Sequence, residues 1–329
     1  MKKTMKIVAV VLCLALVALT FAACGGTKTP YAAGDKVYNI GICQLVQHPA
    51  LDAATQGFMD KLTELLGEEH VKFDNQNASG ESNTCSTIVN QFVAANVDLI
   101  MANATPALQA AVAATADIPI VGTSVTEYGT ALEIDDFNGK TGINVTGTSD
   151  LAPLDKQAAM FAELLPEAKT IGMLYCSAEA NSKYQVKVVT EELEKAGCTV
   201  KEYSFADSND IAAVVTKAVG ECDALYVPTD NTAANNTELI NNIAEPAGIP
   251  IIAGEEGICS GCGIATLSIS YYDLGVATAE VAYDILVNGK NPAEMDIAYA
   301  GTQTQKYMKD RAEKLGVTIP DTYTAIEAE

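Results

Sequence analysis

Short apolar runs alternate along this chain with longer segments in which apolar residues recur every three or four positions. Leu51, Phe58 and Leu62, for example, fall on one face of a helix that begins after the first apolar run. The pattern predicts strands at 38–45, 71–73, 98–104 and 118–122, separated by helices at 49–66, 81–95 and 106–116. Apolar strands that alternate with amphipathic helices predict a parallel sheet with helices on both faces.

The same pattern starts again in the second half of the chain. A strand at 170–175 is followed by a helix at 181–196 and a strand at 223–230, and the Ile-Pro-Ile run at 118–120 returns at 249–251. Chance similarity between common strand–helix units is the alternative. We interpret the repeat as two α/β lobes, each a doubly wound parallel sheet, with a ligand cleft between them.

Charge and composition exclude several classes of partner. The chain has 20 basic and 42 acidic residues and a formal net charge of −22, so it repels nucleic acid and anionic lipid. It has no tryptophan, and Arg311 is its sole arginine. Any ligand carboxylate must therefore be bound without the usual arginine fork.

The first residues have the parts of an export signal. Lys2, Lys3 and Lys6 precede an apolar run at 7–21, and small residues then lead to Cys24. The segment resembles a bacterial lipoprotein signal, which implies that Cys24 is lipidated, for instance with palmitate, and becomes the new N-terminus. An uncleaved membrane anchor is the alternative, but the apolar run is short for a span. We expect a protein held by lipid on the extracytoplasmic face of the cell membrane.

Catalytic and metal chemistry has few candidates in this sequence. The only histidines are His48 and His70, and no phosphate-binding loop or dinucleotide fingerprint is present. Cys259 and Cys262 resemble a redox or half-zinc motif without a second ligand pair, and buried or loop thiols are the alternative. We expect no cofactor, no metal and no catalytic residue.

Polar clusters follow four of the predicted strands, where parallel sheets bind ligands. They lie at 44–48, 103–105, 175–182 and 228–231. Helix capping alone would explain Thr105, Ser182 or Asp230. Four such clusters at facing edges of the two sheets favour a ligand-binding role over capping alone.

These and neighbouring segments carry a more specific resemblance. The chain resembles ABC-importer substrate-binding proteins of the type I periplasmic-binding fold that bind tryptophan, tyrosine or phenylalanine. The segments are His48-Pro-Ala-Leu-Asp52, Ala104-Thr-Pro106, Asn144-Val-Thr-Gly-Thr-Ser-Asp150, Glu179-Ala-Asn-Ser182, Val227-Pro-Thr-Asp-Asn231 and Tyr271-Tyr-Asp-Leu-Gly275. The family lacks paired cysteines like Cys259 and Cys262.

The resemblance implies a division of the chain. Residues 1–23 are the signal peptide and 24–36 a tether. The first lobe takes 37–147 plus 273–295, and the second takes 148–272 plus 296–329. Crossings between lobes are expected near 146–150, 268–272 and 294–299.

The candidate ligand-binding residues suit an amino acid. Hydroxyl and amide donors would hold its carboxylate, acidic side chains its ammonium, and Leu51, Tyr175 and Tyr271 an apolar side chain. The full set is Gln47, His48, Leu51, Thr105, Thr146, Asp150, Tyr175, Glu179, Asn181, Ser182, Asp230, Asn231 and Tyr271.

The resemblance implies a function as well as a site. The lobes would close on a small ligand, an aromatic or hydrophobic amino acid, and deliver it to a membrane permease with a separate ATPase. A sugar or nucleoside binder of the same fold, and an exported enzyme that uses Cys259 and Cys262, are the alternatives.

Overall fold

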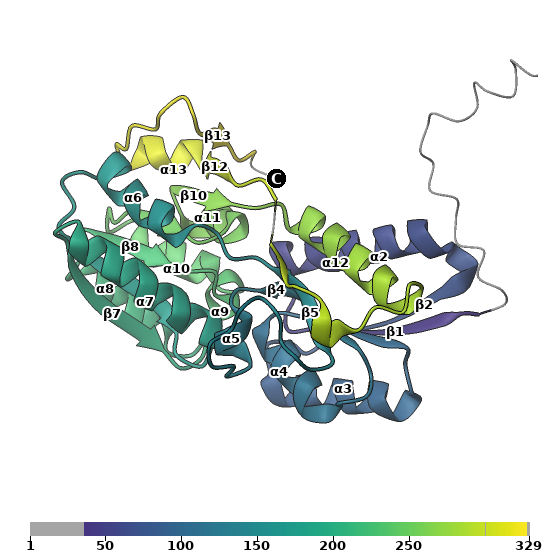
Figure 1. Cartoon of the computed structure of the whole chain (residues 1–329). Coiled ribbons are helices and arrows are strands. Elements are labelled where there is room, and N and C mark those ends of the chain that lie inside the picture. Colours follow the sequence, from purple (N-terminus) through teal and green to yellow (C-terminus); the bar gives the residue numbers. More distant parts are fainter. Residues whose placement is uncertain (1–35, 300, 328–329) are drawn as a thin grey trace, which may run out of the picture.

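The computed structural model describes residues 36–299 and 301–327, which form two α/β lobes side by side (Figure 1). Most of the first lobe comes from the first half of the chain. Its elements are β1 (Tyr38–Gln44), α2 (Pro49–Leu66), η1 (Glu68–His70), β2 (Val71–Asn77), α3 (Ser82–Ala95), β3 (Leu99–Asn103), α4 (Thr105–Ala114), β4 (Ile120–Val125), α5 (Tyr128–Ala131), β5 (Val145–Ser149), α12 (Tyr271–Leu286), η2 (Pro292–Glu294) and β11 (Ala298–Tyr299).

The second lobe is built from the middle of the chain and its C-terminal segment. Its elements are α6 (Leu154–Leu164), β6 (Thr170–Cys176), α7 (Ala180–Lys195), β7 (Thr199–Phe205), α8 (Ile211–Val219), β8 (Ala224–Val227), α9 (Asn231–Ala234), α10 (Thr237–Ala244), β9 (Ile251–Ala253), α11 (Glu256–Cys262), β10 (Ala265–Ser268), β12 (Thr304–Tyr307), α13 (Lys309–Lys314) and β13 (Thr324–Ala325).

The two sheets share one strand order, which confirms the predicted fold class and the repeat. The first sheet runs β11-β5-β4-β3-β1-β2, and the second runs β13-β12-β10-β9-β8-β6-β7. In each, the second strand lies outside the first and the later strands follow on the other side. The order therefore reverses between β1 and β3 and between β6 and β8, and such switch points bind ligands at the carboxyl ends of parallel strands.

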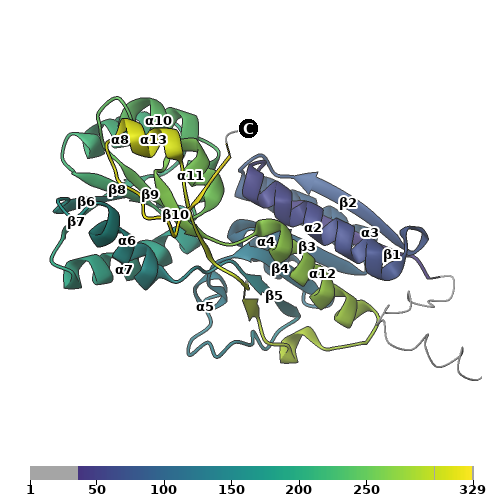
Figure 2. The same ribbon diagram turned by 90° about the horizontal axis from the view of Figure 1, so that it is seen from above.

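Helices cover both faces of each sheet, as the apolar pattern predicts. In the first lobe, α3 and α4 pack on one face through Val89, Phe92 and Leu108. Helices α2 and α12 lie side by side on the other face (Figure 2). In the second lobe, α6 and α7 cover one face, and α8, α10 and α11 cover the other. Each lobe therefore has its own apolar core.

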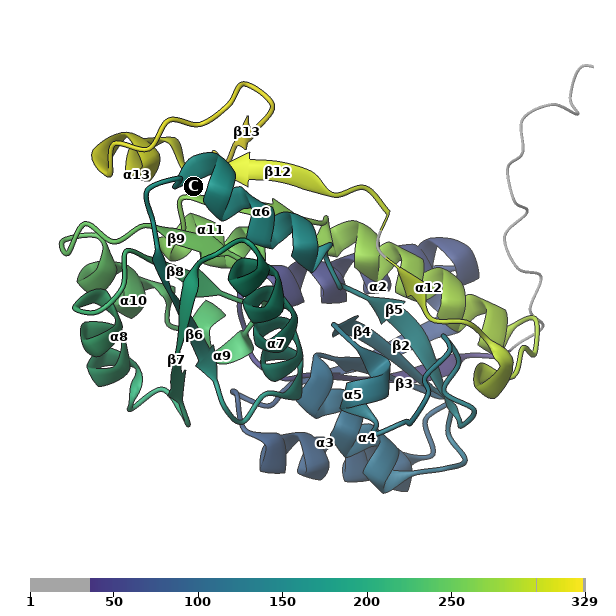
Figure 3. The ribbon, with the colours of Figure 1, turned by 60° about the vertical axis from the view of Figure 1, so that its left-hand side comes forward.

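The C-terminal segment completes the second sheet. Strand β12 pairs antiparallel with β10, and β13 pairs with β12 at the edge (Figure 3). Among the described residues, no helix is both long and apolar enough to span a membrane. The predicted signal peptide, Cys24 and nearly all of the predicted tether lie outside the described residues.

The predicted lobe boundaries need correction by a few residues. Strand β5 extends to Ser149, and β11 pairs with it, so 148–149 and 298–299 belong to the first sheet and not to the second lobe. Helix α12 also begins at Tyr271, two residues before the predicted boundary. The third crossing consequently lies between β11 and β12, later than 294–299. A two-residue strand such as β11 has too little apolar pattern to be predicted.

Close packing of α2 against α12 sets the position of residues at the start of both helices. A Cβ atom on Gly275 would overlap the backbone carbonyl oxygen of Ala54, and one on Gly57 would overlap that of Tyr272. Glycine at these two positions lets the helix backbones touch. The contact brings Ala50 and Ala54 of α2 into one apolar cluster with Tyr271 and Leu274 at the start of α12.

Replacing Gly275 with alanine should destabilise the protein. The added methyl group must push the two helices apart, and overpacking of this kind costs roughly 1–3 kcal/mol. Urea unfolding of Gly275→Ala measures the loss. Gly220→Ala is the matched control, because there the nearest atom would be at an ordinary contact distance of 3.5 Å. Equal stability of both variants would contradict this account of the packing.

Candidate ligand-binding site

A small cavity lies between the lobes at the carboxyl ends of their strands. The volume open to the centre of a water molecule is about 10 Å³, which is room for about one water. Both lobes and the crossing segments contribute to its wall. The lining residues are His48, Leu51, Ser124, Thr126, Asp150, Asn181, Thr229, Asp230, Asn231, Ala234, Glu255 and Tyr271.

His48 and Leu51 reach the cavity from the N-terminus of α2. The loop before the helix is held by the buried Gln44 amide, which donates to the Val46 carbonyl oxygen at 2.9 Å and to Asp52 at 2.6 Å. Pro49 then begins the helix, where a proline needs no backbone donor. His48 therefore occupies a fixed position facing the second lobe.

Ser124 reaches the cavity through an irregularity in β4. The pairing of β4 with β5 shifts register between Gly122 and Val125. Within this bulge Ser124 has a φ of +53°, a left-handed conformation that a serine adopts only under constraint. Bulges redirect side chains near functional sites. The Ser124 hydroxyl is buried and has no hydrogen-bond partner.

Asp150 sits where the chain leaves the first sheet for the second lobe. Its Oδ2 accepts a 2.9 Å hydrogen bond from the Tyr271 hydroxyl, while Oδ1 is buried without a partner. Burial raises the pKa of Asp150. The hydroxyls of Thr126 and Tyr271 oppose this rise in pKa, but no lysine or arginine is among the lining residues to balance the charge.

Asp230 is the centre of a hydrogen-bond network inside the second lobe. Its Oδ2 accepts from the Cys176 backbone N–H and the Ser182 hydroxyl, both at 2.7 Å. Its Oδ1 accepts from the Ala233 N–H at 2.8 Å and so caps α9. Burial, together with the nearby Glu179 carboxylate, raises the pKa of Asp230 to about 7. Asp230 thus lines the cavity but is mainly a structural clamp.

Glu179 is a second clamp in the same lobe. Its carboxylate accepts from the backbone N–H groups of Asn231 at 3.0 Å and Thr232 at 2.9 Å. It also accepts from the Asn231 side-chain amide at 2.6 Å. These bonds join the turn after β6 to the turn after β8 and orient Asn231 toward the first lobe.

Glu255 follows β9 and caps α11. It accepts from the N–H groups of Gly257 and Ile258, and burial raises its pKa to about 7. With Asp150 and Asp230 it brings a third buried carboxylate to the cavity, and no lysine or arginine is among the lining residues.

Four buried polar atoms without partners belong to residues that line this one cavity. They are His48 Nδ1, Ser124 Oγ, Asp150 Oδ1 and Asn181 Oδ1. Buried polar groups are nearly always hydrogen-bonded, since an unmet one costs about 1–3 kcal/mol. Because these residues come from both lobes and lie beside three carboxylates, the cavity has the chemistry of a site for a polar ligand that carries positive charge.

A wider pocket lies next to this cavity at the mouth of the cleft. Its volume open to the centre of a water molecule is about 310 Å³. Its wall includes Glu81, Pro106, Glu179, Asp207 and Asn231. Asn231 lines both spaces. The ligand-sized space in the cleft is therefore outside the inner cavity.

Five predicted site residues lie elsewhere. Gln47 is exposed, and Thr105 and Thr146 are buried outside the wall of either space. The Tyr175 hydroxyl donates to Glu202 at 2.6 Å, and its ring packs in the apolar core of the second lobe, so it is not a ligand wall. Ser182 donates to Asp230 and is likewise structural. The structure brings the other predicted residues to the cleft.

Sequence reasoning missed Ser124, Thr126, Thr229, Ala234 and Glu255. The bulge that turns Ser124 inward leaves no mark in the apolar pattern. Glu255 could have been found, because it follows a strand and precedes a helix just as Asp230 does.

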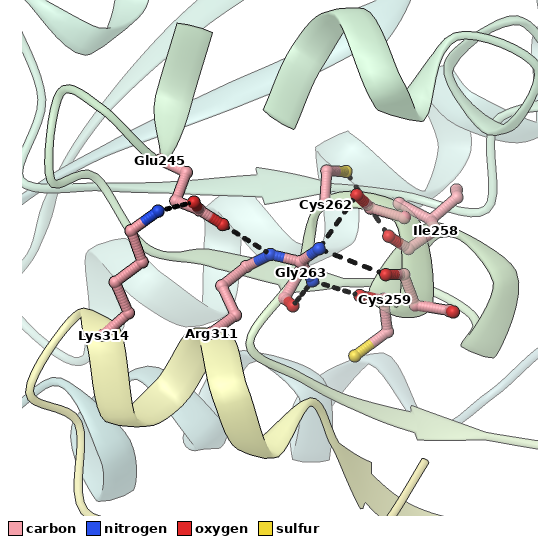
Figure 4. A network of polar contacts seen from close by, with 9 residues as sticks. Glu245, Ile258, Cys259, Cys262, Gly263, Arg311 and Lys314 are labelled. Carbon is pink, nitrogen blue, oxygen red and sulfur yellow. Dashed lines mark hydrogen bonds and ion pairs between the residues drawn. The ribbon is translucent and has the colours of Figure 1, made fainter. Parts of the chain in front are cut away.

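The sole arginine makes a structural contact at the end of α11 (Figure 4), and it is not among the residues that line the cavity. Arg311 donates to the backbone oxygens of Cys259 and Gly263 at 3.0 and 2.6 Å, and also to those of Ser260 and Gly261. It caps the C-terminus of α11, where a cation is favoured. Glu245 pairs with its Nε at 3.4 Å.

The two cysteines of α11 are buried in this contact. Both are free thiols, and burial raises the pKa of Cys262 to about 12 and that of Cys259 well above its usual range. A reactive cysteine needs a lowered pKa and access to solvent. The geometry therefore gives no support to the thiol-dependent enzyme considered above.

Comparison with known proteins identifies the family of this chain. Residues 39–329 match the family described as ABC transporter substrate binding protein. The chain belongs to this family. It is 38% identical over 264 residues, covering 80% of this chain and 76% of the relative, to a protein named tyrosine-binding protein from Clostridioides difficile (strain R20291).

Two solved structures of similar identity to this chain match it to different degrees. A Streptococcus pneumoniae ABC domain in complex with L-Trp is 34% identical, with a TM-score of 0.84 over 88% of this chain and 100% of that one. A ligand-free, open substrate-binding protein with adhesive properties from Clostridium difficile is 37% identical, with a TM-score of 0.68 over 89% and 100%. At similar identity, the better match to the L-Trp complex indicates that the lobes here are not in the open arrangement of the ligand-free protein.

Replacing Asp230 with alanine should lower the free energy of unfolding of the second lobe. The change leaves two backbone N–H groups and the Ser182 hydroxyl without their acceptor, so we expect a loss of roughly 2–4 kcal/mol in the ligand-free protein. Urea unfolding checks this.

Asp210→Ala is the control for that experiment. Asp210 also precedes a helix, α8, but its side chain makes no capping hydrogen bond. If Asp230→Ala were no less stable than Asp210→Ala, the hydrogen bonds of Asp230 would not stabilise the second lobe as we expect.

Proposed function

We propose that this substrate-binding protein captures an amino acid, with an aromatic side chain, between its closing lobes and presents it to an ABC permease. The observation that carries the proposal is the set of unmet buried polar atoms beside carboxylates in the cleft. An ammonium group supplies both the donors and the positive charge that the cavity lacks. The aromatic side chain is suggested by relatives named for tyrosine and solved with L-Trp.

Closure follows from the placement of the unmet atoms. His48 and Ser124 belong to the first lobe, Asn181 to the second, and Asp150 to a crossing segment. A ligand that meets all of them favours the closed form, because the open form cannot make the same contacts. The inner cavity holds only about one water, which is room for an ammonium group and not for a whole amino acid, so the lobes must part for the ligand to enter.

Replacing Asp150 with asparagine tests the ammonium contact. The amide keeps the size of the side chain but loses its charge, so the affinity for tyrosine or tryptophan should fall roughly 10- to 100-fold, as for the loss of a charge-assisted hydrogen bond. Isothermal titration calorimetry measures the affinity. The melting temperature of the ligand-free protein should stay the same or rise, since an uncompensated buried charge is removed.

Asp155→Asn is the matched control. Asp155 is an exposed residue at the start of α6, outside the cleft, and its replacement should leave affinity unchanged. Unchanged affinity in Asp150→Asn would overturn the ammonium contact. A wild-type protein that binds a sugar or nucleoside but neither amino acid would overturn the proposed ligand class.

We further propose that a lipid on Cys24 holds the protein at the outer face of the cell membrane. The support is the order of basic residues, apolar run and small residues before this cysteine. An acidic chain gains nothing from anionic lipid, so its surface charge would not hold it at the membrane, and a covalent lipid would.

Cys24→Ser should release the protein from membranes. Serine cannot be lipidated through sulfur, so the variant should appear in the soluble fraction after cell fractionation, whereas Cys13→Ser should stay with the membrane. Membrane retention of Cys24→Ser would indicate an uncleaved apolar anchor.

A further inference from the structure

We propose that His48 is a specificity-determining residue that selects ligands with a primary ammonium group. In a single tautomer it joins the two lobes through Nε2 and presents Nδ1 as an acceptor to the ligand. With Asp150 and Asn181 it would provide three hydrogen-bond acceptors, one for each N–H bond of the ligand's ammonium group. The inference rests on the proposed function, which it deepens by naming the ligand group that is recognised.

The tautomer of His48 follows from its partner across the cleft. His48 Nε2 lies 3.4 Å from Asn231 Oδ1. The Asn231 amide cannot be reversed, because its Nδ2 donates to the Glu179 carboxylate at 2.6 Å. Oδ1 is therefore the acceptor, and Nε2 must carry the proton.

A neutral imidazole with a proton on Nε2 has a bare lone pair on Nδ1. Burial lowers the pKa of His48, which keeps the ring neutral. Only 7% of the residue is exposed, and Nδ1 has no partner. His48 thus adds an acceptor to a cavity that already has acidic walls.

Asn181 is fixed in the same way. Its Nδ2 donates to the Thr229 carbonyl oxygen at 2.9 Å and to the Glu179 carboxylate at 3.2 Å. Its Oδ1 must then point away from these acceptors, and it is buried without a partner. Ionised Asp150 contributes Oδ1 as well, so three of the four unmet atoms around the cavity are acceptors.

These acceptors come from both lobes and a crossing segment, so all three surround the ligand only when the lobes are closed. A primary ammonium can satisfy all three at once, whereas an N-methyl ammonium has two N–H bonds and an α-hydroxyl has one. A ligand that leaves a buried acceptor unpaired is rejected by a site built to bind the missing group. Closure itself would then distinguish primary amines from close analogues.

The test compares matched ligands with wild-type protein and His48→Leu. Calorimetry gives the dissociation constants of L-tyrosine and N-methyl-L-tyrosine, and of L-tryptophan and its N-methyl analogue. In the wild type we expect the primary amine to bind at least 10-fold more tightly. In His48→Leu its affinity should fall at least 10-fold and that of the N-methyl analogue less than 3-fold, so that the preference disappears.

Two controls separate this effect from damage to the fold. His48 makes no capping hydrogen bond in α2, so its loss should leave the melting temperature of the ligand-free protein almost unchanged. His70→Leu removes the other histidine, outside the cleft, and should keep the wild-type preference. Loss of the lobe contact alone would weaken both ligands equally and leave their ratio intact.

NMR of ¹⁵N-labelled histidine in the amino-acid complex gives a second readout. We expect the spectrum of a neutral ring protonated on Nε2. A proton on Nδ1, or an unchanged preference in His48→Leu, would overturn the inference while leaving the proposed function standing. A wild-type protein that binds neither amino acid would instead reject the proposed function, and the inference with it.

Discussion

Buried hydrogen-bond acceptors without donors are the constraint on which this structure depends. Asp150 Oδ1, Asn181 Oδ1 and His48 Nδ1 belong to residues around one cavity in which the protein offers no cation. Closing the lobes over these atoms is unfavourable until a ligand brings N–H groups and positive charge. The cost of the empty closed state is what makes closure depend on the ligand.

The surrounding carboxylates illustrate how the protein keeps such acceptors in place. Asp230, Glu179 and Glu255 accept hydrogen bonds from backbone N–H groups at the starts of helices or turns. The bonds of Asp230 and Glu179 fix the turns that carry Asn181 and Asn231, while the Asn181 side-chain oxygen is left without a partner. Two matching sheets, with the same strand order, bring the loops of both lobes to one cleft.

Much of this architecture could be predicted from the sequence because its signals are local. Buried parallel strands such as β1 and β3 are continuous apolar runs, and the repeat of that pattern gives the second lobe. His48, Asp150 and Asp230 could be placed at the cleft because they follow strands. Ser124 could not, since its direction depends on a bulge in the pairing of β4 with β5. Tyr175 was misplaced because strand position alone does not tell which face of a sheet a side chain occupies.

The crystal structure of the protein bound to L-tyrosine or L-tryptophan tests the account most directly. It should show closed lobes with the ligand ammonium within hydrogen-bond distance, roughly 2.7–3.2 Å, of Asp150 Oδ1, Asn181 Oδ1 and His48 Nδ1. An ammonium group that instead faces solvent or the outer pocket, with those three atoms still unpaired, would contradict it.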